Sequence, residues 1–513
     1  MALAGLDVGT SGCKVMLFRE DGTIVAQSYR EFSFITPQPG WLEIDPEQIW
    51  KSVLDSLGEI VKKSKESKES IDVVAVTSHG ETLIPIDRSC KALYNALANF
   101  DTRAHTYIDY WLDRGDPYYF FQITGMPLHG MYTVNKILWL KDHCPEVFNN
   151  TWKFCCVEDY IIYRLTEEQP VIDYSLAART MLFDVIKKEW SEKICKLADV
   201  DPQNLSQAIP SGSIAGTISP SVSNISGLPK NLLVATGGHD QPCGVLGCGV
   251  KNPGEAMYGI GTSECVALNL GEKAFFSREM MENSFCCYPH VVKDSYITLA
   301  YIASGAAVLR WFRDEFGFEE LEEAAQVGES AYDLLLKKIP DKPASVFVLP
   351  HFSGTGTPYL DEKSRGAIVG LTLATTREEI ARAILESLTY EMKINLDLYE
   401  KFGLNINSLR AIGGGSRSKV WLQIKADILQ KALIIPKTEE AVALGTAMLA
   451  GIAKGVFHGF EEAIDAMVSF GDSIQPDHGY QENYKNRYQV YQLIYKNLQK
   501  VNWVISDLTR EEQ

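Results

Sequence analysis

The sequence has no long hydrophobic run and no excess of positive charge. No apolar stretch approaches the roughly 18 residues that a membrane-spanning helix needs. The N-terminus, MALAGLDVGTSGCKVMLF, lacks a basic region and reaches Asp7 almost at once, so we expect no signal peptide. Asp and Glu number 66 against 49 Lys and Arg, a net charge of −17 at pH 7, which repels phosphate backbones and anionic lipid. These features argue against nucleic acid and membranes as main partners and favour a cytoplasmic protein.

The sequence also lacks the spacing patterns of transition-metal and P-loop sites. Its eleven cysteines include two adjacent pairs but no CxxC, and its nine histidines form no HExxH. We therefore expect buried structural thiols and no transition metal. No segment has the form GxxxxGK[ST], which excludes a P-loop nucleotide site.

What the sequence does contain is one α/β pattern that occurs twice. The 513 residues, 46% hydrophobic and 22% charged, predict a folded chain of two or three domains. In the first half, strands are predicted at 3–8, 13–18, 23–32, 71–77 and 232–236, a helix at 48–61, and a solvated charged stretch at 62–70. In the second half, strands are predicted at 256–260, 264–269, 296–300, 346–349 and 409–412, with helices at 384–399 and 420–430. This repetition predicts two mixed α/β lobes, 1–246 and 247–513.

Three turns combine glycine with hydroxyl side chains directly after predicted strands: Gly9–Gly12, Gly259–Ser263 and Gly413–Ser416. Glycine lets the backbone approach a phosphate closely, and Thr or Ser hydroxyls supply donors. Any one of these turns is better explained as a simple hairpin. Two in matching positions of two lobes favour phosphate binding, with Asp7 as a candidate ligand of Mg²⁺ through water.

Polar side chains follow two of the predicted strands. Asp240, in the segment Gly-Gly-His-Asp-Gln-Pro, is placed where ligands of open α/β sheets bind and is a candidate acceptor for a hydroxyl proton. A helix N-cap explains Asp240 equally well, and the two roles can coexist. His79 and Glu81 are candidates to bind sugar hydroxyls, as are Asp101 and Arg103, although each alone is more simply explained as a loop residue.

Together these segments resemble the motifs of FGGY carbohydrate kinases, within the actin, sugar kinase and Hsp70 ATPase superfamily. The resemblance spans nearly the whole chain. It rests on two phosphate motifs (Asp7–Lys14 and Gly259–Ser263), an adenosine motif (Gly413–Gln430), two signature segments (Met131–His143 and Gly366–Glu386) and the segment of the catalytic aspartate (Gly237–Gly249).

The resemblance implies an α/β fold of two ribonuclease H-like lobes around a cleft, with sugar held mainly by the N-terminal lobe and ATP by the C-terminal lobe. It implies that Asp240 is the catalytic base and that Asp7 organises Mg²⁺. The residues that it places at ATP are Thr10, Ser11, Lys14, Gly261, Thr262, Gly305, Gly414, Gly415 and Ser418. Those that it places at the substrate are Ser78, His79, Glu81, Asp101, Arg103 and Gln241.

The predicted acceptor pocket mixes two branches of this family. His79-Gly80 resembles the ketose contact of xylulose kinases, although Ser78 replaces the usual Met and Asn99 the usual Trp. Glu81 and Asp240-Gln241 resemble glycerol kinase, although Gly80 replaces the Arg that accompanies the Glu. The segment Asp173–Thr180 again favours the pentulose branch.

The resemblance thus predicts ATP-dependent phosphorylation of a terminal hydroxyl of a small sugar, with a ketose favoured over a polyol such as glycerol or a tetritol. The alternatives are a non-catalytic ATP-binding switch and a sugar sensor of the same fold. A homodimer is left open.

Overall fold

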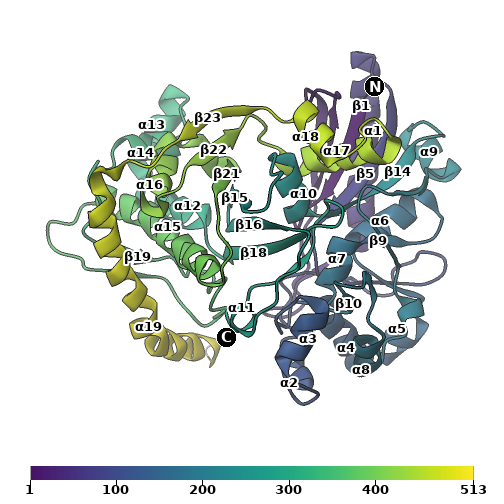
Figure 1. Cartoon of the computed structure of the whole chain (residues 1–513), viewed down its shortest axis with the longest axis horizontal. Helices are drawn as coiled ribbons and strands as arrows, with labels where there is room; N and C mark the ends of the chain where they lie inside the picture. The colour runs from purple at the N-terminus through teal and green to yellow at the C-terminus, as the bar shows by residue number, and fades with distance from the viewer. Residues whose placement is uncertain (1, 512–513) are drawn as a thin grey trace.

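The computed structural model describes residues 2–511, which fold into two lobes built around two mixed β-sheets (Figure 1). The N-terminal sheet has the strand order β13-β14-β5-β1-β2-β3. Its strands are β1 (Ala2–Val8), β2 (Gly12–Phe18), β3 (Ile24–Glu31), β5 (Ile71–Ser78), β13 (Ile214–Thr217) and β14 (Leu233–His239). The strands β1, β2 and β3 form an antiparallel meander, and β1, β5 and β14 run parallel.

The C-terminal sheet has the order β17-β18-β16-β15-β21-β22-β23. Its strands are β15 (Glu255–Ile260), β16 (Glu264–Gly271), β17 (Tyr288–Pro289), β18 (Tyr296–Ile302), β21 (Ser408–Ile412), β22 (Leu433–Pro436) and β23 (Phe470–Ile474). Here β15, β16 and β18 form the antiparallel meander, and β15, β21 and β22 run parallel. Each sheet ends in an antiparallel strand, β13 or β23. The two lobes therefore share one topology, which confirms the predicted repetition.

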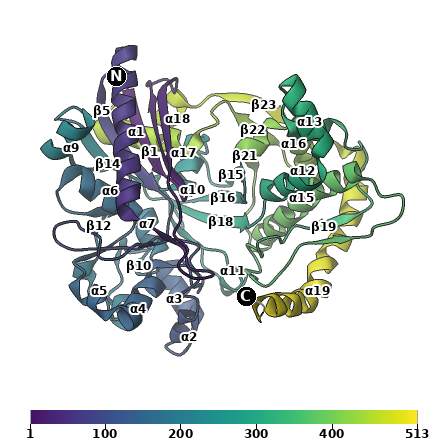
Figure 2. The same cartoon turned by 180° about the vertical axis from the view of Figure 1, so that it is seen from behind.

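Helices cover both sheets (Figure 2), and pairs of short strands lie in the segments that connect the main elements. The helices of the first half are α1 (Pro46–Ser67), α2 (Tyr107–Leu112), α3 (Pro117–Thr124), α4 (Thr133–His143), α5 (Pro145–Asn150), α6 (Val157–Thr166), α7 (Tyr174–Arg179), α8 (Glu192–Ala198), α9 (Pro220–Ser226) and α10 (Asp240–Gly247). Those of the second half are α11 (Arg278–Glu282), α12 (Ala306–Phe316), α13 (Phe318–Val327), α14 (Ala331–Lys337), α15 (Arg377–Lys401), α16 (Lys419–Leu429), α17 (Ala441–Lys454), α18 (Phe460–Met467) and α19 (Gln481–Glu511). The short pairs are β4 (Glu43–Ile44) with β7 (Ala96–Leu97), β6 (Ile84–Ile86) with β8 (Lys153–Cys155), β9 (Val171–Asp173) with β12 (Gln207–Ile209), β10 (Phe183–Asp184) with β11 (Glu189–Trp190), and β19 (Phe347–Leu349) with β20 (Ala367–Val369).

The first helix shows how local sequence sets these elements. Asp45 caps α1 by accepting a hydrogen bond from the amide of Glu47 at 2.9 Å, and Pro46 occupies the first turn, where its missing N–H costs nothing. Ile49 and Val53 lie on the face of α1 that packs against β2 and β3. The helix continues to Ser67, so the predicted charged stretch forms its last turns and not a separate loop.

Two helices from the second half of the chain pack on the N-terminal sheet. Helix α17 crosses β1 and α10 at glycines: a Cβ on Gly5 would lie 2.3 Å from the carbonyl oxygen of Ala443, and one on Gly445 2.0 Å from that of Cys243. Helix α18 follows α17 into the same apolar cluster. The predicted division after residue 246 therefore separates the two sheets, but α17 and α18 lie with the first of them.

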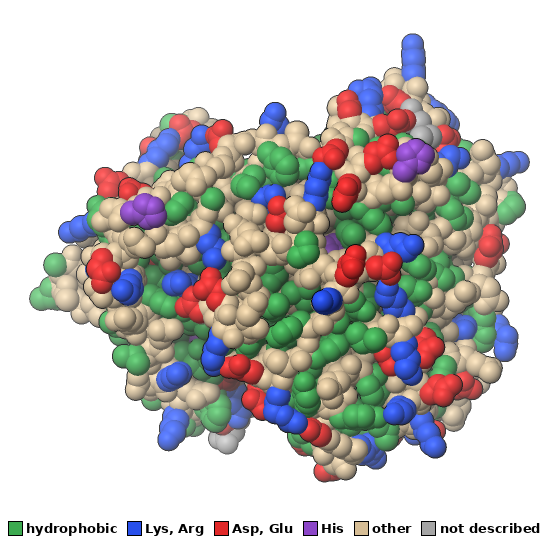
Figure 3. Space-filling model, viewed as in Figure 1, with side chains coloured by type: hydrophobic (Ala, Val, Ile, Leu, Met, Phe, Trp, Pro, Cys, Tyr) green, Lys and Arg blue, Asp and Glu red, His purple; other side chains and the backbone are tan. Residues whose placement is uncertain are grey.

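The surface carries mixed charge. On the face shown in Figure 3, acidic side chains are interspersed with Lys and Arg and do not form one large patch. Among residues 2–511, no helix combines the length and the hydropathy that crossing a bilayer requires.

Candidate active site

The parallel strands of the N-terminal sheet bring three polar segments to one edge. Val8 on β1 pairs with Ser78 on β5, and Ser78 pairs with His239 on β14, so the three strands end at the same level. Asp7, the turn after Ser78 and Asp240 therefore meet at the carboxyl ends of these strands, where ligands of open α/β sheets bind. The sequence predicted that Asp240 lies at this edge of the sheet.

Asp240 is the first residue of α10, and its side chain is about 25% exposed. Burial in this recess raises the pKa of its carboxyl to about 6, and the charge of Glu81 adds to the increase. Directly before it, the His239 amide donates to Ser175 Oγ at 2.8 Å, which fixes the end of β14 against α7. The result is a carboxyl group held at a sheet edge with a pKa suited to accepting a proton near neutral pH.

His239 itself contacts the carboxyl group of Asp240. Its Nε2 lies 3.2 Å from Asp240 Oδ1, and its Nδ1 lies 2.9 Å from the hydroxyl of Tyr288. Burial, with the nearby charge of Arg179, holds the pKa of His239 well below its ordinary value, so the imidazole is neutral. A neutral ring that accepts from Tyr288 at Nδ1 carries its hydrogen on Nε2, the nitrogen that lies nearer the Asp240 carboxyl group.

Asp7 lies near Asp240 and has an uncompensated oxygen. Its Oδ1 is buried without a hydrogen-bond partner. Burial and the charge of Asp240 raise the Asp7 pKa to about 7, and Lys14 opposes the increase. Lys14 Nζ forms an ion pair with Glu440 Oε2 at 2.7 Å, which connects β2 to the start of α17.

A buried carboxylate oxygen without a donor, beside a second carboxylate, suits a hard cation such as Mg²⁺. Within residues 2–511 there is no group of three or more His, Cys, Asp or Glu side chains that could hold a metal ion. Asp7 alone would thus supply few ligands. This fits Mg²⁺, which commonly keeps several waters and binds substrate phosphates.

His79 and Ser78 serve as anchors of their turn. His79 Nδ1 donates to the Val8 carbonyl at 3.0 Å, and its Nε2 bonds Thr82 Oγ1 at 2.8 Å, so both ring nitrogens have partners. Burial lowers the pKa of His79, which keeps the ring neutral. The Ser78 hydroxyl donates to the carbonyl of His79 at 3.0 Å. These contacts fix the turn to β1 and leave the His79 ring no free donor.

Glu81 occupies a left-handed backbone conformation in this turn, with φ of 63°. Its carbonyl oxygen accepts from Lys136 Nζ at 2.8 Å and from Thr133 Oγ1 at 3.2 Å, both on α4. Lys136 is fully buried, and burial lowers its pKa to about 8. The segment Met131–His143 thus clamps the turn, and the Glu81 carboxylate forms an ion pair with the guanidinium of Arg179 at the end of α7.

The structure places Asp101 and Arg103 in a buried network. Arg103 Nη2 contacts Asp101 Oδ2 and Glu43 Oε1, each at 2.8 Å, and its guanidinium lies between the rings of Trp41 and Trp139. The second carboxylate oxygen of Asp101 accepts from the amide and Nε of Arg103 at 3.0 and 2.9 Å. This arrangement favours a structural role for the pair.

The nucleotide motifs of the C-terminal lobe come together at the turn between β15 and β16. The Gly305 amide donates to the Thr262 carbonyl, and that of Ala306 to the Gly261 carbonyl, both at 2.8 Å. A Cβ on Gly415 would lie 2.3 Å from Ile260 Cγ2, just before the turn. Glycine at this position is therefore required by the close approach of the two segments.

The remaining nucleotide candidates occupy loop and cap positions. Ser418 caps α16 by accepting from the Trp421 amide at 3.2 Å, and a Cβ on Gly414 would meet nothing within 4 Å. Thr10 and Ser11 form the turn between β1 and β2, where the Ser11 carbonyl accepts from the Phe32 amide at 3.0 Å.

Asp240 lies close to both lobes. Its negative charge contributes to the raised pKa of Cys265 on β16, two residues beyond the turn Gly261–Ser263. Gln241, the neighbour of Asp240 in α10, is partly exposed at the same edge. The carboxyl group therefore lies near Asp7 on β1 and near Cys265 on β16.

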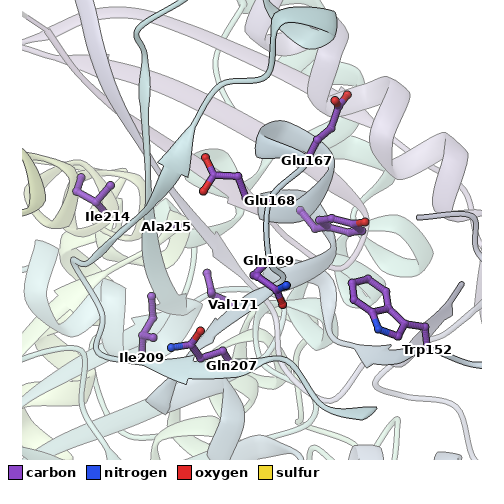
Figure 4. Close-up of a pocket in the computed structure, with 10 residues that line it drawn as sticks. Trp152, Glu167, Glu168, Gln169, Val171, Gln207, Ile209, Ile214 and Ala215 are labelled. Atoms are coloured by element: carbon purple, nitrogen blue, oxygen red, sulfur yellow. The ribbon is translucent and has the colours of Figure 1, made fainter. Parts of the chain in front are cut away.

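Two cavities help to locate the acceptor. One of about 580 Å³ lies on the N-terminal lobe and is lined by residues such as Trp152, Gln169 and Gln207; it contains none of the predicted site residues (Figure 4). A smaller cavity of about 130 Å³ lies between the lobes, lined by Asn99 and Met131 from the first and by residues such as Tyr301 and Thr355 from the second. The Met131 carbonyl accepts from Lys136 Nζ at 2.9 Å, and the same Nζ donates to the Glu81 carbonyl, so this cavity adjoins the Glu81 turn.

Sequence reasoning missed Arg179, His239 and Tyr288 as members of this site. Arg179 is 98 positions from Glu81, and Tyr288 is 49 from His239. No local spacing connects residues so far apart. The Gly-Gly-His-Asp segment pointed to Asp240 only, and the segment Asp173–Thr180, which contains Arg179, indicated a branch of the family but no site residue.

The paired sheets, the two glycine turns and the carboxylate between them are what we expect of a kinase for small hydroxyl compounds. Sequence profiles of the FGGY family of carbohydrate kinases match the chain, the N-terminal domain over residues 2–247 and the C-terminal domain over residues 256–454. The chain belongs to this family and is a carbohydrate kinase.

Individual relatives come from two branches of the family. The chain is 28% identical to xylulose kinase of Bacillus subtilis over 507 residues, which cover 99% of each protein. It is 31% identical to glycerol kinase 2 of Thermotoga maritima over 464 residues, covering 89% of this chain and 91% of the relative. The solved structure titled as a xyloylose kinase from Brucella ovis superposes with a TM-score of 0.86 at 25% identity, covering 98% of this chain and all of the other. These similarities support a sugar or polyol kinase.

Proposed function

We propose that the protein transfers the γ-phosphoryl group of ATP to a terminal hydroxyl of a small ketose, with Asp240 as the general base. The observation that carries the proposal is the position of Asp240: a carboxyl group at the edge where β1, β5 and β14 end, close to Asp7 and to Cys265 on β16, with its pKa raised to about 6. A cytoplasmic location, where ATP is available, belongs to the same proposal.

In the proposed reaction, the acceptor hydroxyl gives its proton to Asp240 as its oxygen bonds to the γ-phosphorus. The bond between the γ-phosphorus and the β–γ bridging oxygen breaks, and ADP leaves. The neutral His239 holds the carboxylate in place. The backbone amides of the turns at Thr10 and Thr262 donate hydrogen bonds to phosphate oxygens. Asp7 would hold Mg²⁺, which supplies charge neutralisation for the phosphates when it is bound.

The acceptor is proposed to lie between Asp240 and the Glu81 turn, with Gln241 beside it. A ketose is favoured by the resemblance of His79-Gly80 to xylulose kinases and by the similarity to the Bacillus subtilis enzyme. A polyol is the second candidate, because Glu81 and Gln241 occur together and the chain is also similar to glycerol kinases.

A coupled assay of ADP release tests the proposal. Purified protein with ATP and Mg²⁺ is offered D-xylulose, D-ribulose, D-fructose, glycerol and erythritol, and each product is confirmed by mass spectrometry. We expect ADP release to depend on one class of acceptor and to be low without it. ADP release that no acceptor increases would favour an ATP-binding switch and contradict the proposal.

A further inference from the structure

The ion pair between Glu81 and Arg179 leaves one atom of each side chain without a strong partner. Arg179 directs its Nε and Nη2 to the same carboxylate oxygen, Glu81 Oε1. Glu81 Oε2 has no hydrogen bond among residues 2–511. Arg179 Nη1 has only two sulfur atoms within reach, Met126 Sδ at 3.5 Å and Cys286 Sγ at 3.8 Å, and sulfur is a weak acceptor. A strong acceptor and a strong donor therefore remain available side by side.

The position of Arg179 is fixed from both lobes. Its guanidinium carbon lies 5.4 Å from the ring centre of Tyr132 in the first lobe and 5.6 Å from that of Tyr288 in the second. The sulfur contacts are divided in the same way, with Met126 from the first lobe and Cys286 from the second. Since the side chain is about 8% exposed, it is held in one place and retains an opening to the site.

Gly80 provides the room for this arrangement. A Cβ at residue 80 would lie 3.3 Å from Arg179 Cγ, 3.4 Å from Arg179 Cβ and 3.4 Å from His239 Cδ2. The first distance is slightly tighter than ordinary van der Waals contact and the other two lie at its limit, so a side chain at residue 80 would have to displace Arg179 by a few tenths of an ångström. The Arg179 side chain is therefore packed closely against residue 80, and a side chain there would disturb it.

The pair also lies close to the proposed base. The charge of Glu81 raises the pKa of Asp240, and that of Arg179 lowers it. An acceptor molecule whose terminal hydroxyl reaches Asp240 would therefore have its remaining oxygens near the pair.

We infer, on the basis of the proposed function, that Arg179 is a specificity-determining residue. Arg179 and Glu81 together recognise two adjacent oxygens of the acceptor. Glu81 Oε2 accepts a hydrogen bond from one acceptor hydroxyl, and Arg179 Nη1 donates to the neighbouring oxygen. A donor beside an acceptor suits an α-hydroxyketone, whose carbonyl oxygen can only accept, and a vicinal diol equally. Buried polar groups left unpaired are costly, so the pair would reject an acceptor that lacks either oxygen.

The test combines variants with acceptors that lack one oxygen. Wild type, Arg179→Met, Glu81→Gln and Gly80→Ala are compared in steady-state assays with D-xylulose and 1-deoxy-D-xylulose, and with glycerol and 1,3-propanediol. The first pair of compounds tests a ketose acceptor and the second a polyol acceptor. The pair that is phosphorylated shows whether the two oxygens belong to an α-hydroxyketone or to a vicinal diol. Arg382→Met is the matched control, because it breaks another buried ion pair, that with Glu386 at 2.7 Å, away from the site.

We expect Arg179→Met to raise the acceptor KM at least about thirtyfold while the KM for ATP stays within about twofold. We also expect Glu81→Gln to lose most of the wild-type discrimination against the acceptor that lacks a hydroxyl, because the carboxylate that this acceptor leaves unpaired is gone. Gly80→Ala, which keeps Arg179, should raise the acceptor KM in the same direction. Arg382→Met should lower thermal stability and leave acceptor discrimination unchanged.

Two results would overturn the inference: an unchanged acceptor KM in folded Arg179→Met, or an unchanged acceptor KM in Gly80→Ala if the methionine variant does not fold. Wild-type protein that phosphorylates none of the acceptors would instead contradict the proposed function, and with it the inference. Activity of wild type that is equal toward both members of a pair would overturn the inference alone.

Discussion

His239 Nε2 and Asp240 Oδ1 lie 3.2 Å apart at the junction of β14 and α10. The two residues are adjacent in sequence, yet their side chains turn toward each other because the His239 amide is tied to Ser175 and its Nδ1 to Tyr288. A neutral imidazole that accepts from Tyr288 at Nδ1 has its hydrogen on Nε2, beside the carboxylate proposed as the base. It acts through Asp240 and is a positioning residue.

Replacing Asp240 tests the base directly. Asp240→Asn keeps the size of the side chain and removes its ability to accept a proton, so kcat should fall about 10²- to 10⁴-fold. Nucleotide binding, measured by calorimetry, should stay close to wild type. An Asn variant with more than about a tenth of wild-type kcat would show that another group takes the proton.

The pH dependence follows from the raised pKa of Asp240. The base acts only when ionised, so kcat/KM should fall as the pH drops through about 6, and not near 4, where an exposed aspartate titrates. Above that pH the carboxylate is ionised and the rate should level off. A rate that is constant down to about pH 4.5 would contradict the assignment.

His239 should shift this profile. In His239→Phe the carboxylate loses the hydrogen that faces it, and its pKa rises, so the acid limb moves to higher pH and kcat falls about tenfold. His239→Gln, which can still offer an N–H, should lie between wild type and the Phe variant. Coinciding pH profiles for all three proteins would show that His239 does not position the base.

Asp7 is expected to set the magnesium requirement. Asp7→Asn removes a negative charge from a buried oxygen that has no partner, so the Mg²⁺ concentration for half-maximal activity should rise about tenfold or more. Titrating Mg²⁺ at saturating ATP measures this. The KM for the acceptor should change little, and an unaltered Mg²⁺ curve would remove Asp7 from the metal site.

The crossing of α17 with α10 should be sensitive to one methyl group. Gly445→Ala places a Cβ 2.0 Å from the Cys243 carbonyl oxygen, so we expect a loss of about 2 kcal/mol or more in the free energy of unfolding. Gly459→Ala is the control, because a Cβ there meets nothing within 4 Å. Urea unfolding of both variants gives the comparison, and equal stability would mean that the helices separate without cost.

Much of the fold was predictable because its signals are local. Strands β1, β5, β15 and β21 are short apolar runs that end in glycine or polar turns, and the structure has them within one or two residues of the predicted ends. The catalytic candidate was found for the same reason: Asp240 directly follows a buried strand, and parallel strands place such residues at one edge.

Other features depend on contacts that no local pattern records. Asp101 and Arg103 read as candidates for sugar binding, but Trp41 and Trp139, distant in sequence, enclose the arginine. Helix α17 belongs to the second half of the chain and packs on the first sheet, and its apolar sequence gives no indication of which sheet it covers.

The sequence by itself determined the two repeated α/β lobes, the glycine turns and the carboxylate at the strand end, since hydrophobic period and turn chemistry act over a few residues. The tertiary structure alone decided that Arg179 meets Glu81 across 98 positions and that His239 faces Asp240. The physical reason is that these side chains are buried. A buried charged or polar group without a partner is costly, and only the packing of the whole chain determines which partner lies close enough to pair with it.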